Sequence, residues 1–370
     1  MLIQKNSKWG IGQVRIMILF RTDGNHSIGS GHIMRCLSIA DYAKSYGEKC
    51  IFLIASQDFK KMICLHGHQA IVLDQDYRNM ESQLYLTYEW IQYCEPSVMF
   101  VDSYYVTEAY LSNLHRFCKR FGTKLIYMDD LLSFPYACDV LINYNIFGIE
   151  KKDIYLQMYK TKKIISMPKM LLGPDYAPLR DEFQNLKIRK VRKSVSNILI
   201  STGGADLCHV ALQLVKKILY CTDRLQDFQF HLVLGPLNED IEEINHLIES
   251  SKNIISYINY RKLSILMQNC DLAISAAGST LYELCATQTP TVTYILADNQ
   301  VSGAREFEKR NILKCAGDIR SIGVNKLVDL IMDEIIALAS NYEERERISK
   351  LQRQIVDGQG AKQILKAIFN

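Results

Sequence analysis

The segment 20–35 combines a glycine-rich turn with a histidine that is placed to do proton chemistry. It reads Phe-Arg-Thr-Asp-Gly-Asn-His-Ser-Ile-Gly-Ser-Gly-His-Ile-Met-Arg. An apolar run at 16–20 predicts a strand before it, and apolar residues at helical spacing over 33–46 predict a helix after it. His32 then lies in the first turn of that helix, where free N–H groups and a partial positive charge disfavour an imidazolium. A neutral His32 can accept a proton, so the pattern predicts a general base, although a histidine that only caps or packs fits the same position.

Polar residues also follow further apolar runs of the first half. The segments Asp102-Ser103-Tyr104-Tyr105 and Asp129-Asp130 come where predicted strands end, and open α/β sheets bind ligands at those ends. Paired carboxylates hold magnesium or share acid–base work, but adjacent aspartates also cap the next segment. Asn143 and Asn145 share one face if their segment is extended, and amides on one face suit the hydroxyl and acetamido groups of a sugar. A turn accounts for these two asparagines equally well.

Two glycine turns of the second half stand between a predicted strand and a predicted helix. They read Ser201-Thr202-Gly203-Gly204-Ala205-Asp206 and Ala276-Ala277-Gly278-Ser279-Thr280. Backbone N–H groups at such turns bind phosphate, although neither turn is a full nucleotide-binding signature. Glu283, one turn into the second helix, suits the hydroxyls of a ribose, but the helix dipole alone also favours a carboxylate there.

The elements that must position these residues alternate along the chain. Short apolar runs separated by helical stretches predict a doubly wound parallel sheet in each half, so the fold class is α/β. The predicted strands are 16–20, 51–54, 70–73, 98–101, 125–127, 197–200, 231–234, 254–257, 272–275 and 291–295, and helices are expected from 326 onward.

The domain boundary is expected between Pro174 and Ser196, where prolines and a run of lysines and arginines interrupt the pattern. We therefore predict a loose tail at 1–15, an N-terminal domain carrying His32 at 16–180, an exposed linker at 181–195 and a C-terminal domain at 196–370. Met17 heads the first strand, so either Met1 or Met17 fits as the natural start. The basic run of the linker is expected to be solvated, with contact to an anionic membrane surface as the alternative.

Composition excludes several classes of protein. The 370 residues are 48% hydrophobic and 23% charged, with a formal net charge of +4, which gives no general affinity for nucleic acid. No apolar run approaches the roughly 18 residues of a membrane span, and the polar start lacks the apolar core of a signal peptide. We expect a cytoplasmic protein without stable membrane association. The 11 cysteines form no Cys-x-x-Cys pair, which suits neither a disulfide framework nor a zinc site.

Taken together, these motifs resemble one known family. Phe20-Arg-Thr-Asp-Gly24 with Ile28-Gly-Ser-Gly-His-Ile-Met-Arg35 resembles the amino-terminal signature of the hydrolases that remove UDP from UDP-2,4-diacetamido-2,4,6-trideoxy-β-L-altropyranose in pseudaminic acid biosynthesis, which are related to spore-coat polysaccharide biosynthesis proteins. Further landmarks follow in the family's order over almost the whole chain after Met17: 128–130, 138–145, Tyr176, 179–183, 203–206, 274–276 with Glu283, and 298–300. Ala277-Gly278 departs from some relatives and is closer to related glycosyltransferases.

The resemblance implies a GT-B architecture, in which two Rossmann-like domains face each other, UDP is held mainly by the C-terminal domain and the sugar lies in the cleft. It implies that His32 is the base that activates water. Gly204, Ser279 and Glu283 would bind the diphosphate and ribose, and the backbone near Ile258 would meet uracil. The other positions expected to bind substrate are Asp23, Gly31, Tyr105, Asn145, Arg180, Gly278, Asn299 and Gln300.

The expected reaction is attack by water at the anomeric carbon with inversion, without a metal or other cofactor. It releases UDP and a free diacetamido sugar for pseudaminic acid or a related surface glycan, such as the one that modifies flagellin. The competing prediction is an inverting GT-B glycosyltransferase, in which an acceptor hydroxyl replaces water. A binding protein that has kept the fold without the activity is a third class. The sequence leaves the oligomeric state and the exact acetamido sugar open.

Overall fold

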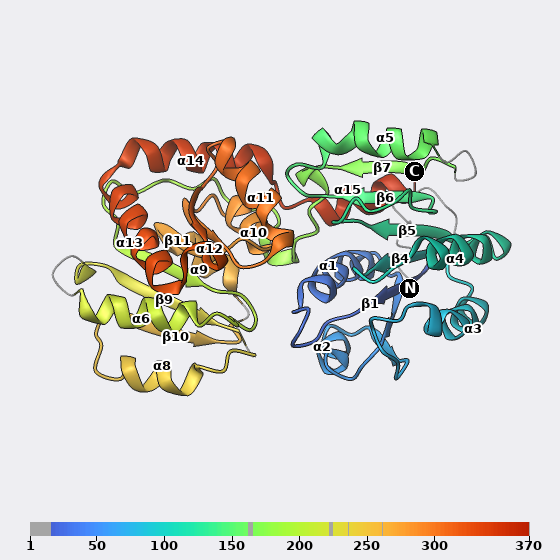
Figure 1. Ribbon diagram of the computed structural model, residues 1–370, viewed down its shortest axis with the longest axis horizontal. Helices are drawn as coiled ribbons and strands as arrows, with labels where there is room; N and C mark the ends of the chain where they lie inside the picture. The colour runs from blue at the N-terminus through green and yellow to red at the C-terminus, as the bar shows by residue number, and fades with distance from the viewer. Residues whose placement is uncertain (1–15, 162–165, 222–224, 236, 261, 370) are drawn as a thin grey trace, which may run out of the picture. The chain divides into compact units, whose positions relative to one another are not determined.

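The computed structural model describes residues 16–161, 166–221, 225–235, 237–260 and 262–369, which form two compact units. The first unit runs to Asp181 and includes the end of the chain from Gln359, and the second is Glu182–Gly358. Each is a parallel sheet flanked by helices (Figure 1). The predicted tail, 1–15, lies outside the described residues.

The sheet of the first unit has the strand order β3-β2-β1-β4-β5-β6-β7, all parallel. Its strands are β1 (Met17–Thr22), β2 (Lys49–Ile54), β3 (Gln69–Val72), β4 (Val98–Asp102), β5 (Lys124–Met128), β6 (Val140–Asn143) and β7 (Lys169–Leu172). The chain winds outward from β1 to β3 and then returns to β4 on the other side of β1. Doubly wound sheets bind ligands at such a reversal, beyond the carboxyl ends of the strands.

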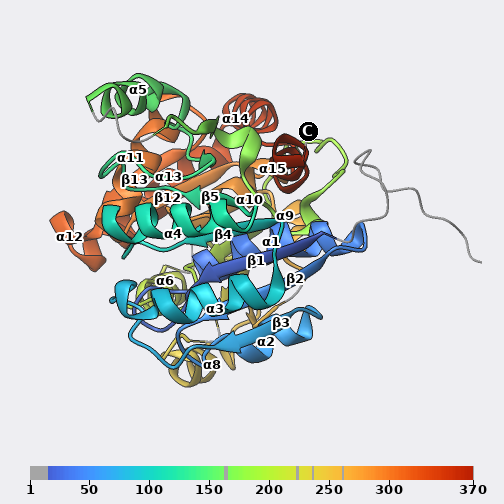
Figure 2. The same ribbon diagram turned by 90° about the vertical axis from the view of Figure 1, so that its right-hand side faces the viewer.

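Helices cover both faces of this sheet (Figure 2). They are α1 (Gly31–Ser45), α2 (Lys60–Leu65), α3 (Leu84–Cys94), α4 (Glu108–Arg120), α5 (Lys152–Thr161) and α15 (Gly360–Phe369), with short 3₁₀ turns η1 (Glu81–Gln83), η2 (Ile149–Lys151), η3 (Pro174–Tyr176) and η4 (Asp181–Phe183), the last spanning the boundary between the units.

The strands of the first unit are apolar on both faces, as a sheet covered on both sides requires. Phe20 of β1 stacks between Phe52 and Phe100 of the neighbouring strands, with ring centroids 4.8 and 4.9 Å away. Leu19, which points to the opposite face, packs in the cluster that includes Leu111 of α4. This two-sided burial fixes the strands that carry the polar residues at their ends.

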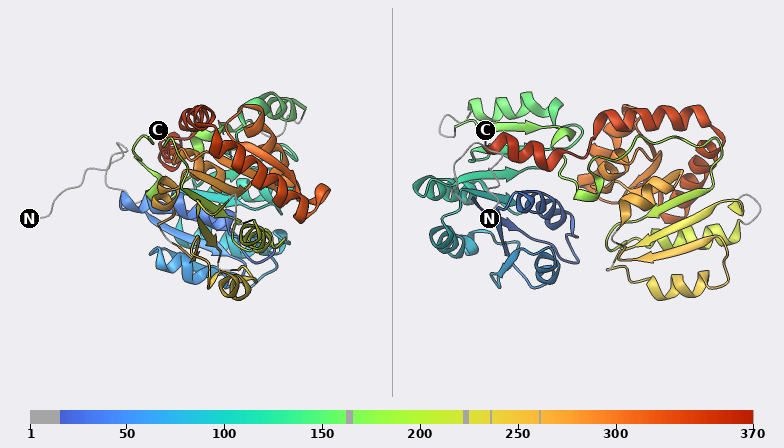
Figure 3. Two further views of the ribbon diagram at one scale, coloured as in Figure 1. Left: turned by 90° about the vertical axis from the view of Figure 1, so that its left-hand side faces the viewer. Right: turned by 180° about the vertical axis from the view of Figure 1, so that it is seen from behind.

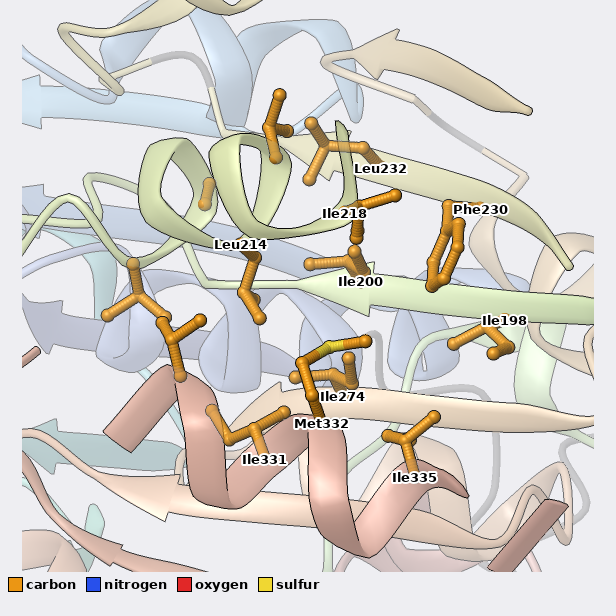
Figure 4. Packing of buried hydrophobic residues seen from close by; sticks show 14 of the residues in the cluster. Ile198, Ile200, Leu214, Ile218, Phe230, Leu232, Ile274, Ile331, Met332 and Ile335 are labelled. Carbon is orange, nitrogen blue, oxygen red and sulfur yellow. The ribbon is translucent and has the colours of Figure 1, made fainter. Parts of the chain in front are cut away.

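The second unit repeats the architecture with the strand order β10-β9-β8-β11-β12-β13. Its strands are β8 (Asn197–Ser201), β9 (Gln229–Leu234), β10 (Ile254–Ile258), β11 (Leu272–Ala276), β12 (Thr291–Ile295) and β13 (Lys314–Asp318). Its helices are α6 (Val210–Tyr220), α8 (Ile241–Ile248), α9 (Leu263–Asn269), α10 (Thr280–Ala286), α11 (Asp298–Lys309), α12 (Ile319–Ile322), α13 (Val324–Ser340) and α14 (Tyr342–Ile355). In its core, Ile200 of β8 lies among side chains of α6 and α13 (Figure 4).

The final helix differs from the predicted domain limits, which assigned 196–370 to the C-terminal domain. α15 packs with the first unit, where Lys124 and Lys169 donate to its carbonyl oxygens at Ile368 and Ala367, at 2.8 and 2.6 Å. Its red ribbon lies beside α1 in Figures 1 and 3. An apolar stripe shows that a helix is buried, but it does not show which sheet buries it.

The basic segment predicted as an exposed linker is partly built into the second unit. Arg189 donates to the carbonyl oxygen of Met267 at 3.1 Å and to Thr289 Oγ1 at 2.9 Å. Arg192 forms an ion pair with Asp271 at 3.0 Å. The expectation of a fully solvated basic run is therefore wrong for these two arginines. Their hydrogen-bond acceptors lie about 80 to 100 residues further along the chain, so the sequence of the run does not indicate them.

Three of the described strands are missing from the predicted list, namely β6, whose segment was considered extended only as one alternative, β7 and β13. β7 is a four-residue strand, and β13 reads Lys-Cys-Ala-Gly-Asp at the edge of its sheet, without an apolar run. Within the described residues, no helix has both the length and the apolar character that a bilayer crossing requires. The 11 cysteines are free thiols.

Candidate active site

His32 lies in the first turn of α1, as the sequence predicts, because the helix begins at Gly31. The register of β1 and β4 places Thr22 opposite Asp102, so the turn after β1 brings His32 to the end of β4. There, His32 Nδ1 lies 2.6 Å from Asp102 Oδ1. Both side chains are buried, with exposed fractions of 5% and 0%. The structure thus joins the predicted base to a carboxylate 70 residues away along the chain.

Arg35 holds this carboxylate in place. It lies three residues after His32 on the same face of α1, as residues i and i+3 of a helix do. Its Nε donates to Asp102 Oδ2 at 2.5 Å, and its Nη2 donates to Asp102 Oδ1, so the contact is bidentate. A bidentate pair of this kind fixes the orientation of the Asp102 carboxylate and also stabilises its negative charge.

The charges explain why Asp102 stays ionised although it is buried. Burial opposes ionisation, but the Arg35 guanidinium and His32 outweigh it and hold the pKa of Asp102 well below its usual value. An ionised carboxylate only accepts hydrogen bonds, so we assign the proton to His32 Nδ1 on its 2.6 Å contact with Asp102, which is shorter than the 3.1 Å approach of Arg35 Nη2 to the same nitrogen. Nε2 of the neutral ring is then the atom that can take a proton from another molecule, and Asp102 can stabilise the imidazolium that results.

A second carboxylate continues the network along the sheet. Asp130 follows β5, and its Oδ2 accepts from Arg35 Nη1 at 2.8 Å. Asn145 follows β6, and its Nδ2 donates to Asp130 Oδ1 at 2.9 Å. Tyr144 Oη also accepts from Arg35, at 3.1 Å. Because β4, β5 and β6 are neighbours in that order, their ends align these polar groups along one edge. We call His32, Asp102, Arg35, Asp130 and Asn145 the relay.

Asp129 caps the next segment. Capping was one of the two interpretations of the Asp129-Asp130 pair. Its Oδ1 accepts from the backbone N–H of Leu131 and from Tyr136 Oη, at 2.8 and 2.7 Å, and its Oδ2 accepts from Tyr155 Oη. Within the described residues, no group of three His, Cys, Asp or Glu side chains is arranged to hold a metal ion. The structure therefore separates the roles of the two aspartates: Asp129 shapes the turn and Asp130 joins the relay.

Four other predicted site residues of the first unit lie outside the relay. Gly31 is the first residue of α1, directly before His32. Asp23 is buried in an ion pair with Arg21 at 2.6 Å, and its Oδ1 accepts from the N–H of Ala55 at 2.7 Å. Tyr105 packs its ring edge-to-face on Tyr77 at 5.3 Å. Arg180 is partly exposed, just before η4 at the boundary of the two units.

The tyrosine that contacts the histidine is Tyr104. Its ring lies edge-to-face on His32, with centroids 4.3 Å apart. The next residue, Tyr105, is the one that the resemblance implies as a substrate contact, and that contact stays a prediction.

In the second unit the two predicted glycine turns lie at neighbouring strand ends. β8 pairs with β11 so that Ser201 stands opposite Ser275, and each turn follows directly. Gly203 adopts φ 93°, which favours glycine. Gly204 packs closely against the next strand end, because a Cβ on Gly235 would lie 2.2 Å from its carbonyl oxygen. The fold thus brings together two turns that are far apart in sequence.

The remaining predicted nucleotide contacts lie along the same edge of the second sheet. Gly278 and Ser279 precede α10, and Glu283 lies within that helix. Asn299 and Gln300 are in the first turn of α11, after β12, and Gln300 Oε1 accepts from the N–H of Leu296 at 2.8 Å. Ile258 ends β10, with 48% of its surface exposed. These positions share one edge, and their contacts with a nucleotide stay predictions.

Arg35 and Tyr144 were not predicted as site residues, and Tyr104 and Asp130 were predicted only as parts of polar strand ends. Arg35 had one usable signal, its i+3 spacing from His32 on a predicted helix. Asp102 and Asp130 were noted as polar strand ends, but nothing in the sequence shows that one arginine bridges them.

The chain is similar both to a glycosyltransferase domain and to a UDP-sugar hydrolase. Residues 197–357 match the model of the glycosyltransferase family 28 C-terminal domain. Over 298 residues the chain is 22% identical to the UDP-2,4-diacetamido-2,4,6-trideoxy-β-L-altropyranose hydrolase of Campylobacter jejuni, covering 79% of this chain and 96% of that protein. It is 28% identical over 291 residues to an uncharacterized protein of Methanocaldococcus jannaschii, covering 76% of this chain but spanning only 55% of that protein.

The solved structures agree on the fold. A glycosyltransferase from Rickettsia africae superimposes with a TM-score of 0.58 at 16% sequence identity, covering 96% of this chain and 98% of that one. The predicted fold class is therefore confirmed: the chain has a GT-B type fold made of two Rossmann-like domains.

Proposed function

We propose that this protein hydrolyses a UDP-linked diacetamido-trideoxy sugar, UDP-2,4-diacetamido-2,4,6-trideoxy-β-L-altropyranose, to UDP and the free sugar. The observation that carries the proposal is the buried contact of His32 with Asp102, held by Arg35. It supplies an oriented imidazole at the carboxyl edge of a doubly wound sheet, where such folds bind ligands. The similarity to the Campylobacter jejuni hydrolase over most of both chains supports the substrate class.

In the proposed reaction His32 Nε2 takes a proton from water while the water oxygen forms a bond to the anomeric carbon. The bond between that carbon and the diphosphate oxygen breaks, and UDP leaves with the electron pair. Asp102 stabilises the resulting His32 imidazolium until His32 releases the proton to solvent. Attack opposite the leaving group inverts the anomeric configuration.

The second unit would bind the UDP part through the glycine turns after β8 and β11, with Gly204, Gly278, Ser279 and Glu283 as the contact residues. Backbone N–H groups at helix starts meet the charge that develops on a departing diphosphate, and Arg180 would add a positive charge. UDP is already a good leaving group, so the proposed mechanism uses no metal. The product would serve pseudaminic acid or a related surface glycan.

A second candidate is an inverting glycosyltransferase that uses a UDP-sugar. The match of residues 197–357 to a glycosyltransferase C-terminal domain favours it, and so does the Ala277-Gly278 pair. An acceptor hydroxyl would then replace water at the same base.

Incubation of the protein with the UDP-sugar alone separates the two candidates. We expect UDP and free sugar to form without any acceptor, at a rate that is lost in His32→Asn. A protein that releases UDP only after an acceptor is added is a transferase. Tight binding of UDP without turnover on a panel of UDP-linked diacetamido sugars would instead indicate a binding protein.

A further inference from the structure

The amide of Asn145 has a fixed orientation, because both groups that its nitrogen contacts are acceptors. Its Nδ2 donates to Asp130 Oδ1 at 2.9 Å and to Asn143 Oδ1 at 3.0 Å. A flipped amide would point its oxygen at two other oxygens. Hydrogen-bond networks of this kind identify which side-chain atom of an asparagine is the oxygen and which is the nitrogen.

The acceptor character of Asn143 Oδ1 is itself settled by its neighbours. Asn143 is fully buried, and its Nδ2 donates to Tyr155 Oη at 2.9 Å. Tyr155 in turn donates its proton to Asp129. Asn143 Oδ1 also accepts from the backbone N–H of Asn145 at 3.1 Å. The hydrogen bonds are therefore donated in one consistent direction, from Asn145 through Asn143 and Tyr155 to Asp129.

The backbone at Asn145 is held as firmly as its side chain. The N–H of Gly148 donates to the carbonyl oxygen of Asn145 at 2.7 Å, which closes a tight turn. A Cβ on Gly148 would lie 2.5 Å from the carbonyl oxygen of Asn143, so only glycine fits the turn without a shift. Asn145 thus presents its side chain in one position before any ligand arrives, which lowers the entropic cost of binding.

Asn145 Oδ1 is the part of this amide left for a ligand. In the part of the chain that the structure describes, it receives no hydrogen bond, and the residue is partly exposed. The position is close to the predicted base, since Asn145 contacts Asp130, Asp130 contacts Arg35, and Arg35 Nη2 lies 3.1 Å from His32 Nδ1. An atom that only accepts is matched by a group that only donates.

We infer that Asn145 Oδ1 accepts a hydrogen bond from the N–H of an acylamino group on the sugar, and that this contact selects N-acylated amino sugars. The inference rests on the proposed function, in which a sugar binds at the carboxyl edge of the first sheet. It adds that Asn145 Oδ1 is the atom that recognises the acetamido group. Asn145 is a specificity-determining residue in this view. The bond-breaking steps at the anomeric carbon belong to His32.

Binding to an inactive protein tests the inference without turnover. His32→Asn protein is titrated calorimetrically with two synthetic ligands, the UDP-2,4-diacetamido sugar and its diacetoxy analogue, in which ester oxygens replace the N–H groups. We expect the diacetamido compound to bind at least about tenfold more tightly, in line with loss of a hydrogen bond and the approach of two acceptor oxygens. Adding Asn145→Ala should reduce this preference to about onefold by weakening the diacetamido compound.

Asn113→Ala on the exposed surface of α4 is the matched control, because it makes the same chemical change away from the relay, and the preference should persist there. Equal affinities of the two ligands, or a preference that survives Asn145→Ala, would overturn the inference. UDP alone is titrated in parallel. If UDP binds but the sugar substituents make no difference, the inference fails while the UDP-sugar proposal stands. If neither UDP nor the UDP-sugars bind, both fail.

Discussion

Asp102 and Asp206 are two buried aspartates near the carboxyl edges of the two sheets, and their pKa values shift in opposite directions. Asp102 is 0% exposed and lies against Arg35 and His32, which hold its pKa well below the usual value. Asp206 is 5% exposed, and the hydrogen bonds that it accepts come from the backbone N–H groups of Val210 and Ala211. Burial, against the pull of these N–H groups, raises the pKa of Asp206 to about 6.

The contrast shows that a cationic partner, rather than burial alone, decides the charge of an aspartate inside a protein. It also distinguishes the chemistry of the two edges. The first unit gathers polar and charged side chains into the relay, which orients the His32 imidazole. The second unit offers glycine turns and backbone N–H groups, which suit an anion.

The largest expected effect comes from removing the base. His32→Asn should lower kcat for UDP release by about a hundredfold or more, since general-base catalysis contributes that much. KM should change little, because the ring acts on water rather than on the nucleotide. Steady-state kinetics with the UDP-sugar measure both. Near-normal turnover would remove His32 from the proposed role and reduce the relay to a structural feature.

A smaller loss of activity is expected when the carboxylate partner is neutralised. Asp102→Asn can turn an N–H toward His32, which favours the ring form with its proton on the wrong nitrogen, so kcat should fall by about tenfold or more. It also leaves Arg35 without one of its buried partners, which typically costs roughly 3–5 kcal/mol of stability. Kinetics and thermal melting are measured on the same preparation.

Asp139→Asn is the control for this variant. Asp139 also belongs to the first unit, and it forms an ion pair with Lys119 at 2.5 Å, but it lies before β6 at the opposite end of the sheet. It should lower stability while leaving turnover unchanged. If both variants lose activity in proportion to their melting temperature, Asp102 has only a structural role.

Two glycines at helix starts allow a matched test of the nucleotide edge. Gly31 and Gly278 both have ordinary φ values and no atom within 4 Å of an added Cβ, so alanine should fit either fold. If the diphosphate rests on the turn before α10, Gly278→Ala places a methyl group against it. The Kd for UDP should then rise about tenfold, about 1.4 kcal/mol, while Gly31→Ala leaves it unchanged. The opposite pattern would assign UDP to the first unit.

The last prediction concerns stability rather than activity or binding, and it tests the charge of Asp206. Its pKa in the folded protein, about 6, lies above the value of about 3.9 in an unfolded chain, so the folded state holds a proton that the unfolded state has released. The free energy of unfolding should therefore decrease as the pH rises from about 4 to about 6, by about 2 kcal/mol from this group. Asp206→Asn tolerates the positive φ of 49° and should remove that slope. Urea unfolding at several pH values measures it, and identical slopes in both proteins would contradict the assignment.

The sequence was sufficient for the elements that have a strong local pattern. The apolar strands β1, β4, β8 and β11 were expected where they occur, because a strand buried on both faces reads as a continuous apolar run. The place of His32 at the start of a helix followed from the glycines before it. β13 was missed because an edge strand that reads Lys-Cys-Ala-Gly-Asp lacks that pattern.

The contacts of the site were harder to predict, because they depend on register and side-chain reach over long distances in the chain. Arg35 joins Asp102 and Asp130, which lie 67 and 95 residues further on. No local pattern links three such positions. Asp23, which the resemblance implies as a substrate contact, forms a buried ion pair with Arg21, a partner that the sequence pattern did not indicate, and its contact with a substrate stays a prediction.

The most direct test of the central claim, that water activated by His32 attacks the sugar carbon, is a single turnover in water enriched in oxygen-18. The protein is mixed with the UDP-2,4-diacetamido sugar without any acceptor, and both products are analysed by mass spectrometry. We predict one labelled oxygen in the free sugar and none in UDP. Label recovered in UDP would mean attack at phosphorus and would contradict the account.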